Sequence, residues 1–150
     1  MKKELADKLF GKYPEFFMER SHRWPRLSLL WNRITNSWNL PPLTMSLMRF
    51  SFECGPGWYD LLDNLFKNIK VANKSPLFQI IQVKEKFGTL RVYCNFSTDI
   101  IEDLIELAEC RSSRTCELCG KYGKRRGKGW ISTLCDLCWE EDQRRKNVQK

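Results

Sequence analysis

The chain has 150 residues, of which 42% are hydrophobic and 13% aromatic, and it carries a formal net charge of +8. A chain of this length and composition can bury a core and need not be disordered. No apolar run approaches the length of a membrane span, and no charged segment leads into an apolar one as in a secretory leader. We therefore expect a cytoplasmic protein without a membrane partner.

The positive charge lies at the two ends of the chain. Residues 1–50 and 111–150 are basic, whereas residues 51–110 hold nine acidic and six basic side chains. Basic ends on an acidic body suit a polyanion or an acidic protein surface as the partner.

The first fifty residues predict helices. Apolar residues recur at helical spacing from Leu5 to Phe17, with a break at Pro14, and again between Pro25 and Pro41. The second stripe contains tryptophans seven residues apart, which we interpret as core and not as a stacking ladder for bases: Trp24, Trp31 and Trp38. The only histidine, His22, lies in a polar turn and is expected to be solvated.

Residues 48–53 alternate apolar and polar side chains, which predicts a short strand before the turn Cys54-Gly55-Pro56-Gly57. The apolar stripe from Trp58 to Ile69 then predicts an amphipathic helix. A glycine turn before a helix can bind phosphate, but Asp60 and Asp63 would repel an anion. We therefore favour a structural turn.

Residues 78–96 predict a β-hairpin. Pairing Val83 with Leu90 and Ile81 with Val92 collects apolar side chains on one face. The turn would then span residues 84–89. It forms either a solvated tip or a small basic and aromatic contact surface, with the cations Lys84, Lys86 and Arg91.

Residues 97–99 offer helix caps, and Glu102 stands in capping-box position to Asp99, so the next helix should begin here. One side of this helix is apolar. The other is acidic, and we expect a solvated face and not catalytic carboxylates at Glu102, Asp103, Glu106 and Glu109.

The strongest chemical pattern is two cysteine pairs, Cys116 with Cys119 and Cys135 with Cys138, separated by fifteen residues. This is the spacing of a four-thiolate zinc site, whereas a redox dithiol normally stands alone. Because four cysteines leave no open position on the ion, we expect one structural Zn²⁺. The other cysteines match no ligand spacing and are interpreted as small apolar residues: Cys54, Cys94 and Cys110.

The flanks of the two pairs refine this prediction. Gly120 permits the positive-φ turn of a zinc knuckle, and the residues after Cys138 have helical composition with acids first and bases last. A knuckle, a hairpin and ligands at the start of a helix make a treble clef. The segment from Cys116 to Trp139 resembles such fingers, including the GATA type; a two-knuckle ribbon is the alternative.

Residues 120–134, between the pairs, form a segment that we call the arm. It contains five cations, no acid, four glycines and two aromatic residues. Glycine lets a backbone approach phosphates, cations neutralise them and aromatics stack on bases, although a solvated hairpin would have a similar composition. The candidate contact residues are Lys121, Lys124, Arg125, Arg126, Lys128 and Trp130.

Four motifs occur in order along most of residues 13–139: Tyr13-Pro-Glu-Phe, Phe52-Glu-Cys-Gly-Pro-Gly-Trp-Tyr-Asp-Leu-Leu, Gln82-Val-Lys-Glu-Lys-Phe-Gly-Thr-Leu-Arg-Val-Tyr, and Arg114-Thr-Cys-Glu-Leu-Cys-Gly leading to Cys135. In these motifs the chain resembles a family of uncharacterised small proteins from bacteria and their phages. The resemblance implies a C-x-x-H-like second pair, from which Cys138 departs. It brings no established activity, and it implies a phage or mobile-element origin with a role directed at host machinery.

We therefore expect an α+β protein. Residues 1–112 form a core domain with a helical N-terminal region and a small antiparallel sheet with packed helices, and residues 113–150 form a treble-clef-like zinc finger with a terminal helix. The expected function is a nucleic-acid-binding module without catalytic residues. The alternative is an inhibitor or adaptor that binds a host protein in the host cytoplasm. A nuclease is least favoured, because treble-clef nucleases need a catalytic histidine and His22 lies far from the finger in sequence.

Overall fold

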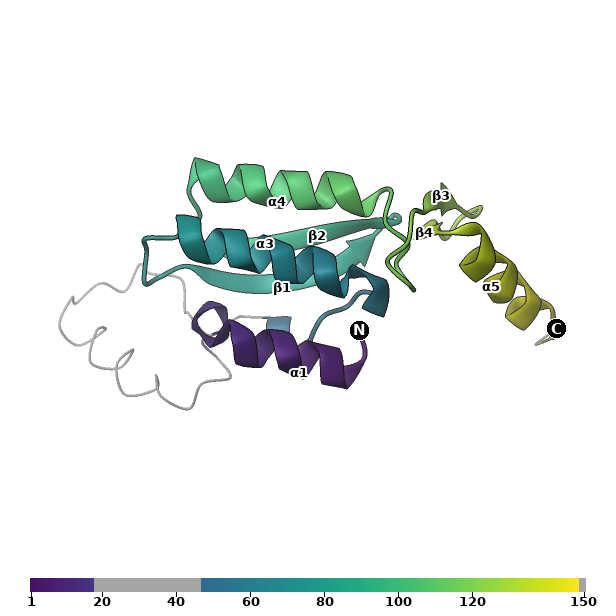
Figure 1. The fold of residues 1–150 in the computed structure, drawn as a ribbon, viewed down its shortest axis with the longest axis horizontal. Coiled ribbons are helices and arrows are strands. Elements are labelled where there is room, and N and C mark those ends of the chain that lie inside the picture. Colours follow the sequence, from purple (N-terminus) through teal and green to yellow (C-terminus); the bar gives the residue numbers. More distant parts are fainter. Residues whose placement is uncertain (18–46, 149–150) are drawn as a thin grey trace.

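The computed structural model describes residues 1–17 and 47–148 of the chain. Within these ranges the protein is α+β, with four α-helices and two small antiparallel sheets (Figure 1). The helices are α1 (Lys3–Lys12), α3 (Tyr59–Ala72), α4 (Asp99–Ser112) and α5 (Asp136–Val148). The sheets pair β1 (Gln79–Lys86) with β2 (Thr89–Asn95), and β3 (Lys124–Arg126) with β4 (Ser132–Leu134). The predicted tryptophan stripe and His22 lie outside the described residues.

Helix α3 is the centre of the core and lies between α1 and α4, against the β1–β2 hairpin (Figure 1). The amphipathic pattern after Trp58 is confirmed, since one side of α3 is buried at Leu62, Leu65, Phe66 and Ile69. This stripe belongs to a single core cluster that also contains residues of α1, the hairpin and α4.

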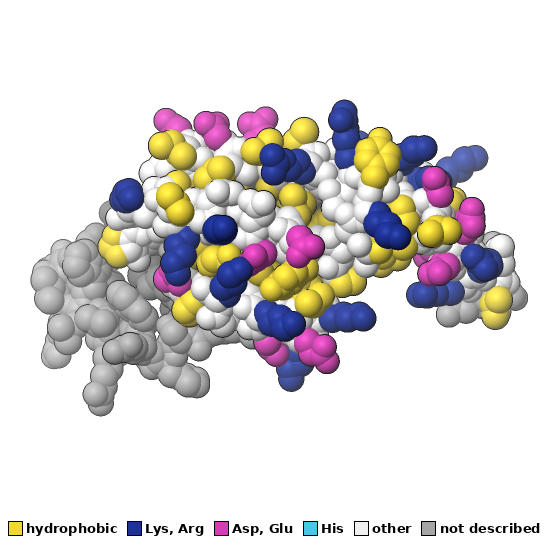
Figure 2. Space-filling view, viewed as in Figure 1, with side chains coloured by type: hydrophobic (Ala, Val, Ile, Leu, Met, Phe, Trp, Pro, Cys, Tyr) yellow, Lys and Arg dark blue, Asp and Glu magenta, His cyan; other side chains and the backbone are white. Residues whose placement is uncertain are grey.

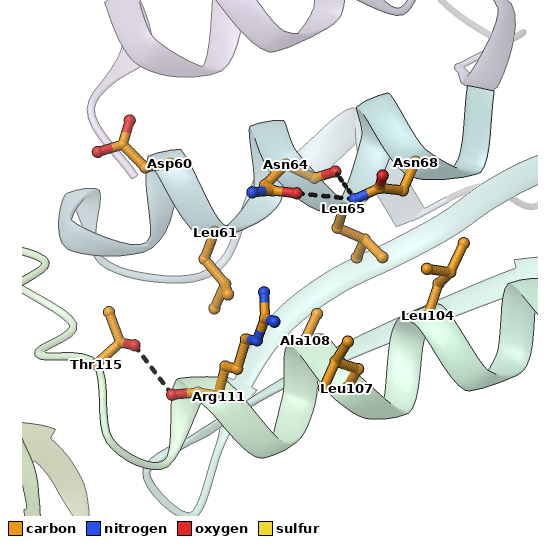
Figure 3. Close-up of a pocket in the computed structure, with 10 residues that line it drawn as sticks. All are labelled: Asp60, Leu61, Asn64, Leu65, Asn68, Leu104, Leu107, Ala108, Arg111 and Thr115. Carbon is orange, nitrogen blue, oxygen red and sulfur yellow. Dashed lines mark hydrogen bonds between the residues drawn. The ribbon is translucent and has the colours of Figure 1, made fainter. Parts of the chain in front are cut away.

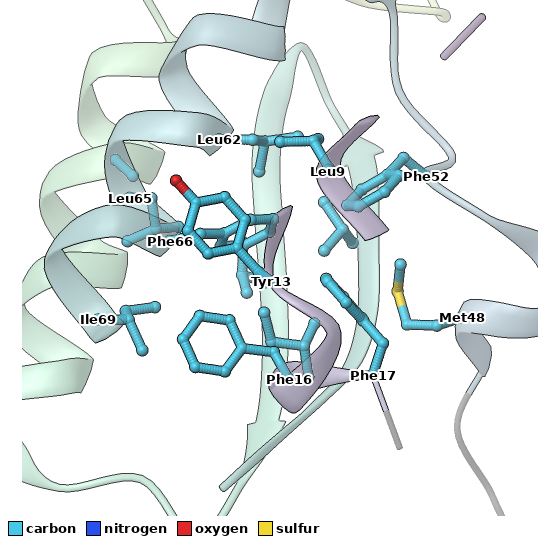
Figure 4. Packing of buried hydrophobic residues seen from close by; sticks show 14 of the residues in the cluster. Leu9, Tyr13, Phe16, Phe17, Met48, Phe52, Leu62, Leu65, Phe66 and Ile69 are labelled. Atoms are coloured by element: carbon cyan, nitrogen blue, oxygen red, sulfur yellow. The ribbon is translucent and has the colours of Figure 1, made fainter. Parts of the chain in front are cut away.

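An aromatic cluster fixes the N-terminal segment to α3. The ring of Phe66 lies 5.6 Å from that of Tyr13, 6.2 Å from that of Phe16 and 5.8 Å from that of Phe17, each edge to face (Figure 4). Two of these rings come from the end of α1 and the short 3-10 helix Pro14–Phe16. Edge-to-face pairs contribute about 0.5–1.5 kcal/mol each beyond the burial of area. The apolar stripe predicted at the N-terminus is therefore part of the hydrophobic core.

A polar contact beside this cluster links the same elements and is sensitive to acid. The Asp63 carboxylate accepts hydrogen bonds from Lys12 Nζ at 2.6 Å and the Tyr13 hydroxyl at 2.9 Å. Partial burial alone would raise the pKa of Asp63, but these hydrogen bonds outweigh it and hold the pKa below its ordinary value of 3.8. The ionised form is therefore the one that the fold favours.

We expect Asp63→Asn to lower the free energy of unfolding at neutral pH by on the order of 1 kcal/mol, because the amide oxygen of asparagine accepts the Tyr13 hydrogen bond without the added strength of a charged acceptor. Since the folded pKa is lowered, the contribution of Asp63 is present above the unfolded pKa and is lost as the pH falls through the folded value. Urea unfolding of the parent and variant at pH 7 and near pH 3 measures this. A difference that stays constant between the two pH values would contradict the assignment.

The β1–β2 hairpin is confirmed, but its predicted register is wrong. Val83 pairs with Val92 and Lys84 with Arg91, two residues away from the expected pairing. The turn contains only Phe87 and Gly88, with φ of 52° and 78°, the left-handed pair that matches the twist of a two-residue hairpin. An irregularity between Ile80 and Gln82 also shifts the strand, so that Ile80 is fully buried and Ile81 is not.

The strand predicted over residues 48–53 is wrong for most of its length. Residues Leu47–Phe50 form a 3-10 helix, and Ser51 adopts a φ of 67° that interrupts an extended backbone. Only the end of the segment contacts the sheet, where Glu53 forms a parallel bridge with Lys84. This places the following glycine turn beside the hairpin.

Side chains of α4 accept hydrogen bonds from backbone N–H groups on the outer edge of β2. Glu109 accepts a hydrogen bond from Val92 N at 3.1 Å, and the buried Ser112 hydroxyl accepts one from Leu90 N at 2.8 Å. Glu109 is therefore a structural residue, which corrects the prediction of a solvated one. The capping box at Asp99 is also wrong: Thr98 stands at the N-cap, and Glu102 accepts a hydrogen bond from Ser97. An edge whose N–H groups are occupied is not free to pair with another chain.

Candidate metal centre and its contacts with the core

The four predicted ligands lie together. The sulfur atoms of Cys116, Cys119, Cys135 and Cys138 are all within 4.8 Å of one another, and Cys119 Sγ lies 3.6 Å from Cys135 Sγ. A tetrahedron with Zn–S bonds of about 2.3 Å has sulfur atoms about 3.8 Å apart, so the cluster fits one metal ion. The other cysteines, Cys54, Cys94 and Cys110, lie outside it, and burial raises the pKa of Cys54 to about 12.

The backbone of the first pair forms a tight turn. Gly120, at φ 77°, donates to Cys116 O at 2.8 Å, and Cys116 N donates to Lys121 O at 2.7 Å. The positive φ that the sequence predicted at Gly120 is thus present. Residues 116–121, which we call the knuckle, hold two sulfur atoms on one side of this turn.

The second pair lies at the start of α5. Cys135 immediately precedes the helix and Cys138 is in its first turn, where Cys138 N lies 3.5 Å from Cys135 Sγ. This backbone donor lowers the pKa of Cys135 to about 7, whereas burial and the neighbouring thiols raise the pKa of Cys138. A metal ion would favour the thiolate of all four residues, so metal binding releases protons.

The glycine turn before α3 binds the knuckle and not a phosphate. Gly57 N donates to Glu117 O at 2.7 Å, Gly55 N donates to Glu117 Oε1 at 2.8 Å, and Trp58 Nε1 donates to Thr115 O at 2.8 Å. Burial raises the pKa of Glu117, an effect that the Gly55 N–H partly opposes. These donors fix the knuckle to the N-terminal end of α3.

Both glycines of the turn are sterically required, because there is no room for a Cβ at either position. A Cβ at Gly57 would lie within 2.6 Å of backbone atoms of Cys116, Cys119 and Gly120, and one at Gly55 within 2.6 Å of Glu117. This approach of the turn to the knuckle was not predicted from the sequence. The signal was present as two glycines around Pro56, since glycine marks a close approach of two backbones as well as a phosphate site.

The finger meets the core at a second place, the tip of the hairpin. Arg125 donates to Phe87 O at 3.0 Å, and the buried Thr133 hydroxyl donates to Gly88 O at 2.5 Å. The tip of the hairpin and the finger consequently meet at one end of the core (Figure 1).

The cations of the arm are not equivalent. Lys121, Lys124 and Lys128 are exposed, and none has a carboxylate partner within the ranges that the structure describes. Arg126 is half-buried, forms an ion pair with Asp136 and lies 5.9 Å from the centre of the Trp139 ring. Figure 2 shows Lys and Arg side chains gathered over the finger, with acidic side chains among them.

The cations of the hairpin differ in the same way. Lys86 is exposed near the turn with its Nζ 5.6 Å from the centre of the Phe87 ring, and Lys84 Nζ lies 5.3 Å from that of Tyr93. Arg91 is half-buried, with NH1 3.2 Å from Glu109 Oε2. Lys84 and Lys86 are therefore available for an external anion, whereas Arg91 is neutralised within the protein.

A separate cavity of about 230 Å³ lies between α3 and α4 (Figure 3). Leu61 and Leu65 line one side and Leu104 and Leu107 the other, and the guanidinium of Arg111 extends into the space between the helices. It contacts none of the cysteine ligands.

Among the described residues, no helix has the length and apolar character needed to cross a membrane. No protein-family model, curated protein or solved structure matches this chain. The chain is a small α+β protein whose four clustered cysteines could hold a metal ion.

Proposed function

We propose that this protein is a nucleic-acid-binding module whose arm is held in place by a structural zinc ion. The observation that carries the proposal is the exposure of Lys121, Lys124 and Lys128 on the finger without carboxylate partners among the described residues. Unpaired cations on a rigid support attract phosphates and release counterions from nucleic acid.

Zinc is the ion that best suits the donor set, because tetrahedral four-thiolate sites are typical of structural Zn²⁺. The knuckle, the β3–β4 hairpin and the ligands at the start of α5 follow one another as in a treble clef, which supports that arrangement. Since four cysteines would leave no open position for water or substrate, we assign the metal no catalytic role.

The hairpin cations extend the proposed surface. Lys84 and Lys86 lie on the strand whose tip contacts the arm through Phe87 O and Gly88 O. A polyanion that reached Lys124 and Lys128 would therefore pass near Lys86. Arg126 and Arg91 contribute less, because each already has a carboxylate partner.

The test is the triple variant Lys121→Gln, Lys124→Gln and Lys128→Gln, titrated with labelled DNA at several salt concentrations. For each phosphate that the variant no longer neutralises, the slope of log affinity against log salt should fall by about 0.9 on duplex DNA and about 0.7 on a single strand. Stability and metal content should remain those of the parent, because the three side chains are exposed.

The matched control replaces three exposed lysines elsewhere, Lys3, Lys8 and Lys67, with glutamine. It makes the same change in net charge and should weaken binding much less. Equal effects of the two triple variants would show that only net charge matters and would contradict a contact surface on the arm.

The second candidate is an adaptor or inhibitor that binds a host protein, as the resemblance to phage proteins implies. It is favoured by exposed apolar side chains on the finger, Leu118, Tyr122 and Leu137, which are 45%, 68% and 64% exposed. This candidate takes first place if the parent binds neither duplex nor single strands at low salt and one host protein copurifies with it.

A further inference from the structure

Trp130 separates two adjoining concavities on the finger end of the molecule. The larger, about 610 Å³, lies between the arm and α5 and is lined by Lys128, Trp130, Trp139 and Lys146, among others. The smaller, about 190 Å³, lies between the arm and the hairpin tip and is lined by Phe87 and Trp130. Three aromatic rings, Phe87, Trp130 and Trp139, thus follow one another across this surface, and we call them the aromatic series.

Two rings of the aromatic series, Trp130 and Phe87, are exposed to an extent that packing does not explain, whereas Trp139 is half-buried. Trp130 is 77% exposed and Phe87 61% exposed, although large aromatic side chains are usually buried. Gly127 and Gly129, with φ of 110° and 83°, place Trp130 at the tip of the arm. A Cβ at Gly127 would collide with Trp130 O, so the backbone that presents the indole depends on glycine.

Cations lie between and beside the rings. Lys86 Nζ is 5.6 Å from the centre of the Phe87 ring, and Lys128 and Lys146 line the larger concavity. The carboxylates of the two concavities already have partners: Asp142 pairs with Lys146 at 2.6 Å, and Glu85 accepts a hydrogen bond from Gly88 N at 2.6 Å. Three lysines against these two carboxylates, Lys86, Lys128 and Lys146 against Glu85 and Asp142, leave the lining of the two concavities with a net charge of +1.

We propose that the aromatic series binds single-stranded nucleic acid, with bases stacked on the exposed rings of Trp130 and Phe87 and phosphates near Lys86 and Lys128. This inference rests on the proposed function and narrows its substrate class. Alternating aromatic rings and cations suit a single strand, because its bases expose the faces that a duplex keeps stacked. The larger concavity also falls within the range of about 300–1,000 Å³ typical of ligand sites, which is enough for a base.

The experiment compares the metal-loaded full chain and its Trp130→Ala variant on a fluorescein-labelled oligothymidylate of about 15 nucleotides, within the usual site sizes. Stacking of one base on one aromatic ring is typically worth a factor of about ten to a hundred in affinity, so the variant should bind that much more weakly. Trp130→Phe, which keeps a stacking face, should recover part of the loss. A duplex of the same length should bind the parent more weakly than the single strand does.

Tyr122→Ala is the matched control, because Tyr122 is 68% exposed on the same finger and lines neither concavity. It should bind the single strand as the parent does. If Trp130→Ala and Tyr122→Ala bind alike, or the duplex binds more tightly than the single strand, stacking is overturned while the proposed function stands. If the parent binds neither nucleic acid at about 50 mM salt, both fail, and an apolar protein partner becomes the occupant of this surface.

Discussion

Cys116→Ser should abolish stable metal binding and unfold the finger. Cys116 is fully buried, and its sulfur belongs to the cluster whose four sulfur atoms lie within 4.8 Å of one another. A serine oxygen replaces a soft thiolate with a weak donor, and structural zinc sites bind with about 10–16 kcal/mol. Metal analysis after gel filtration with a mild chelator should give about one ion per parent chain and almost none for the variant.

Cys110→Ser is the control for this experiment, because Cys110 is exposed and lies outside the cluster. Its metal content should equal that of the parent. A Cys116→Ser protein that keeps its metal through the same chelation would remove Cys116 from the ligand set, and with it the four-thiolate site.

Gly57→Ala should destabilise the protein by about 3 kcal/mol, the upper part of the range for overpacking. The added Cβ would lie within 2.6 Å of Cys116 O, Cys119 N and Gly120 N. All three are backbone atoms of the knuckle and cannot rotate away, so relief of the collision requires the knuckle to leave the core. Urea unfolding followed by circular dichroism measures the loss, and the metal should become easier to remove.

Gly11→Ala makes the same chemical change where there is room. Gly11 lies in α1, and a Cβ there meets nothing within 4 Å. Alanine should therefore stabilise the helix by about 0.5–1 kcal/mol. If Gly57→Ala matched this gain, the close approach between the turn and the knuckle would be refuted.

The sequence was sufficient to predict those features that depend on one local pattern of residues. The apolar stripe of α3, the positive φ at Gly120 and the meeting of two cysteine pairs each follow from residue spacing along a short segment. Such features are set by helical periodicity or by ligand geometry, and neither depends on distant parts of the chain.

The sequence-based predictions failed where residues far apart in the chain determine the local structure. The hairpin register depended on a left-handed Phe87, a conformation that composition does not indicate for phenylalanine, and the arm packs against this turn through Arg125. Helical periodicity predicted a solvated Glu109 because it carries no information on the partners of this side chain in β2, Val92 N and the Arg91 guanidinium. The close approach of Gly57 to the knuckle likewise joins residues about sixty positions apart.

The hydrogen bonds from Gly55, Gly57 and Trp58 to residues 115 and 117 couple two equilibria, metal binding by the finger and folding of the core. A ligand that binds only the folded state stabilises it by RT ln(1 + [L]/Kd), or about 2.7 kcal/mol at a hundredfold excess over Kd. Because the knuckle is bonded to the start of α3, this linkage reaches the helix that carries Phe66 and the aromatic cluster. The availability of free metal ion in the cell would then determine what fraction of chains resists unfolding and proteolysis, in the core as well as in the finger.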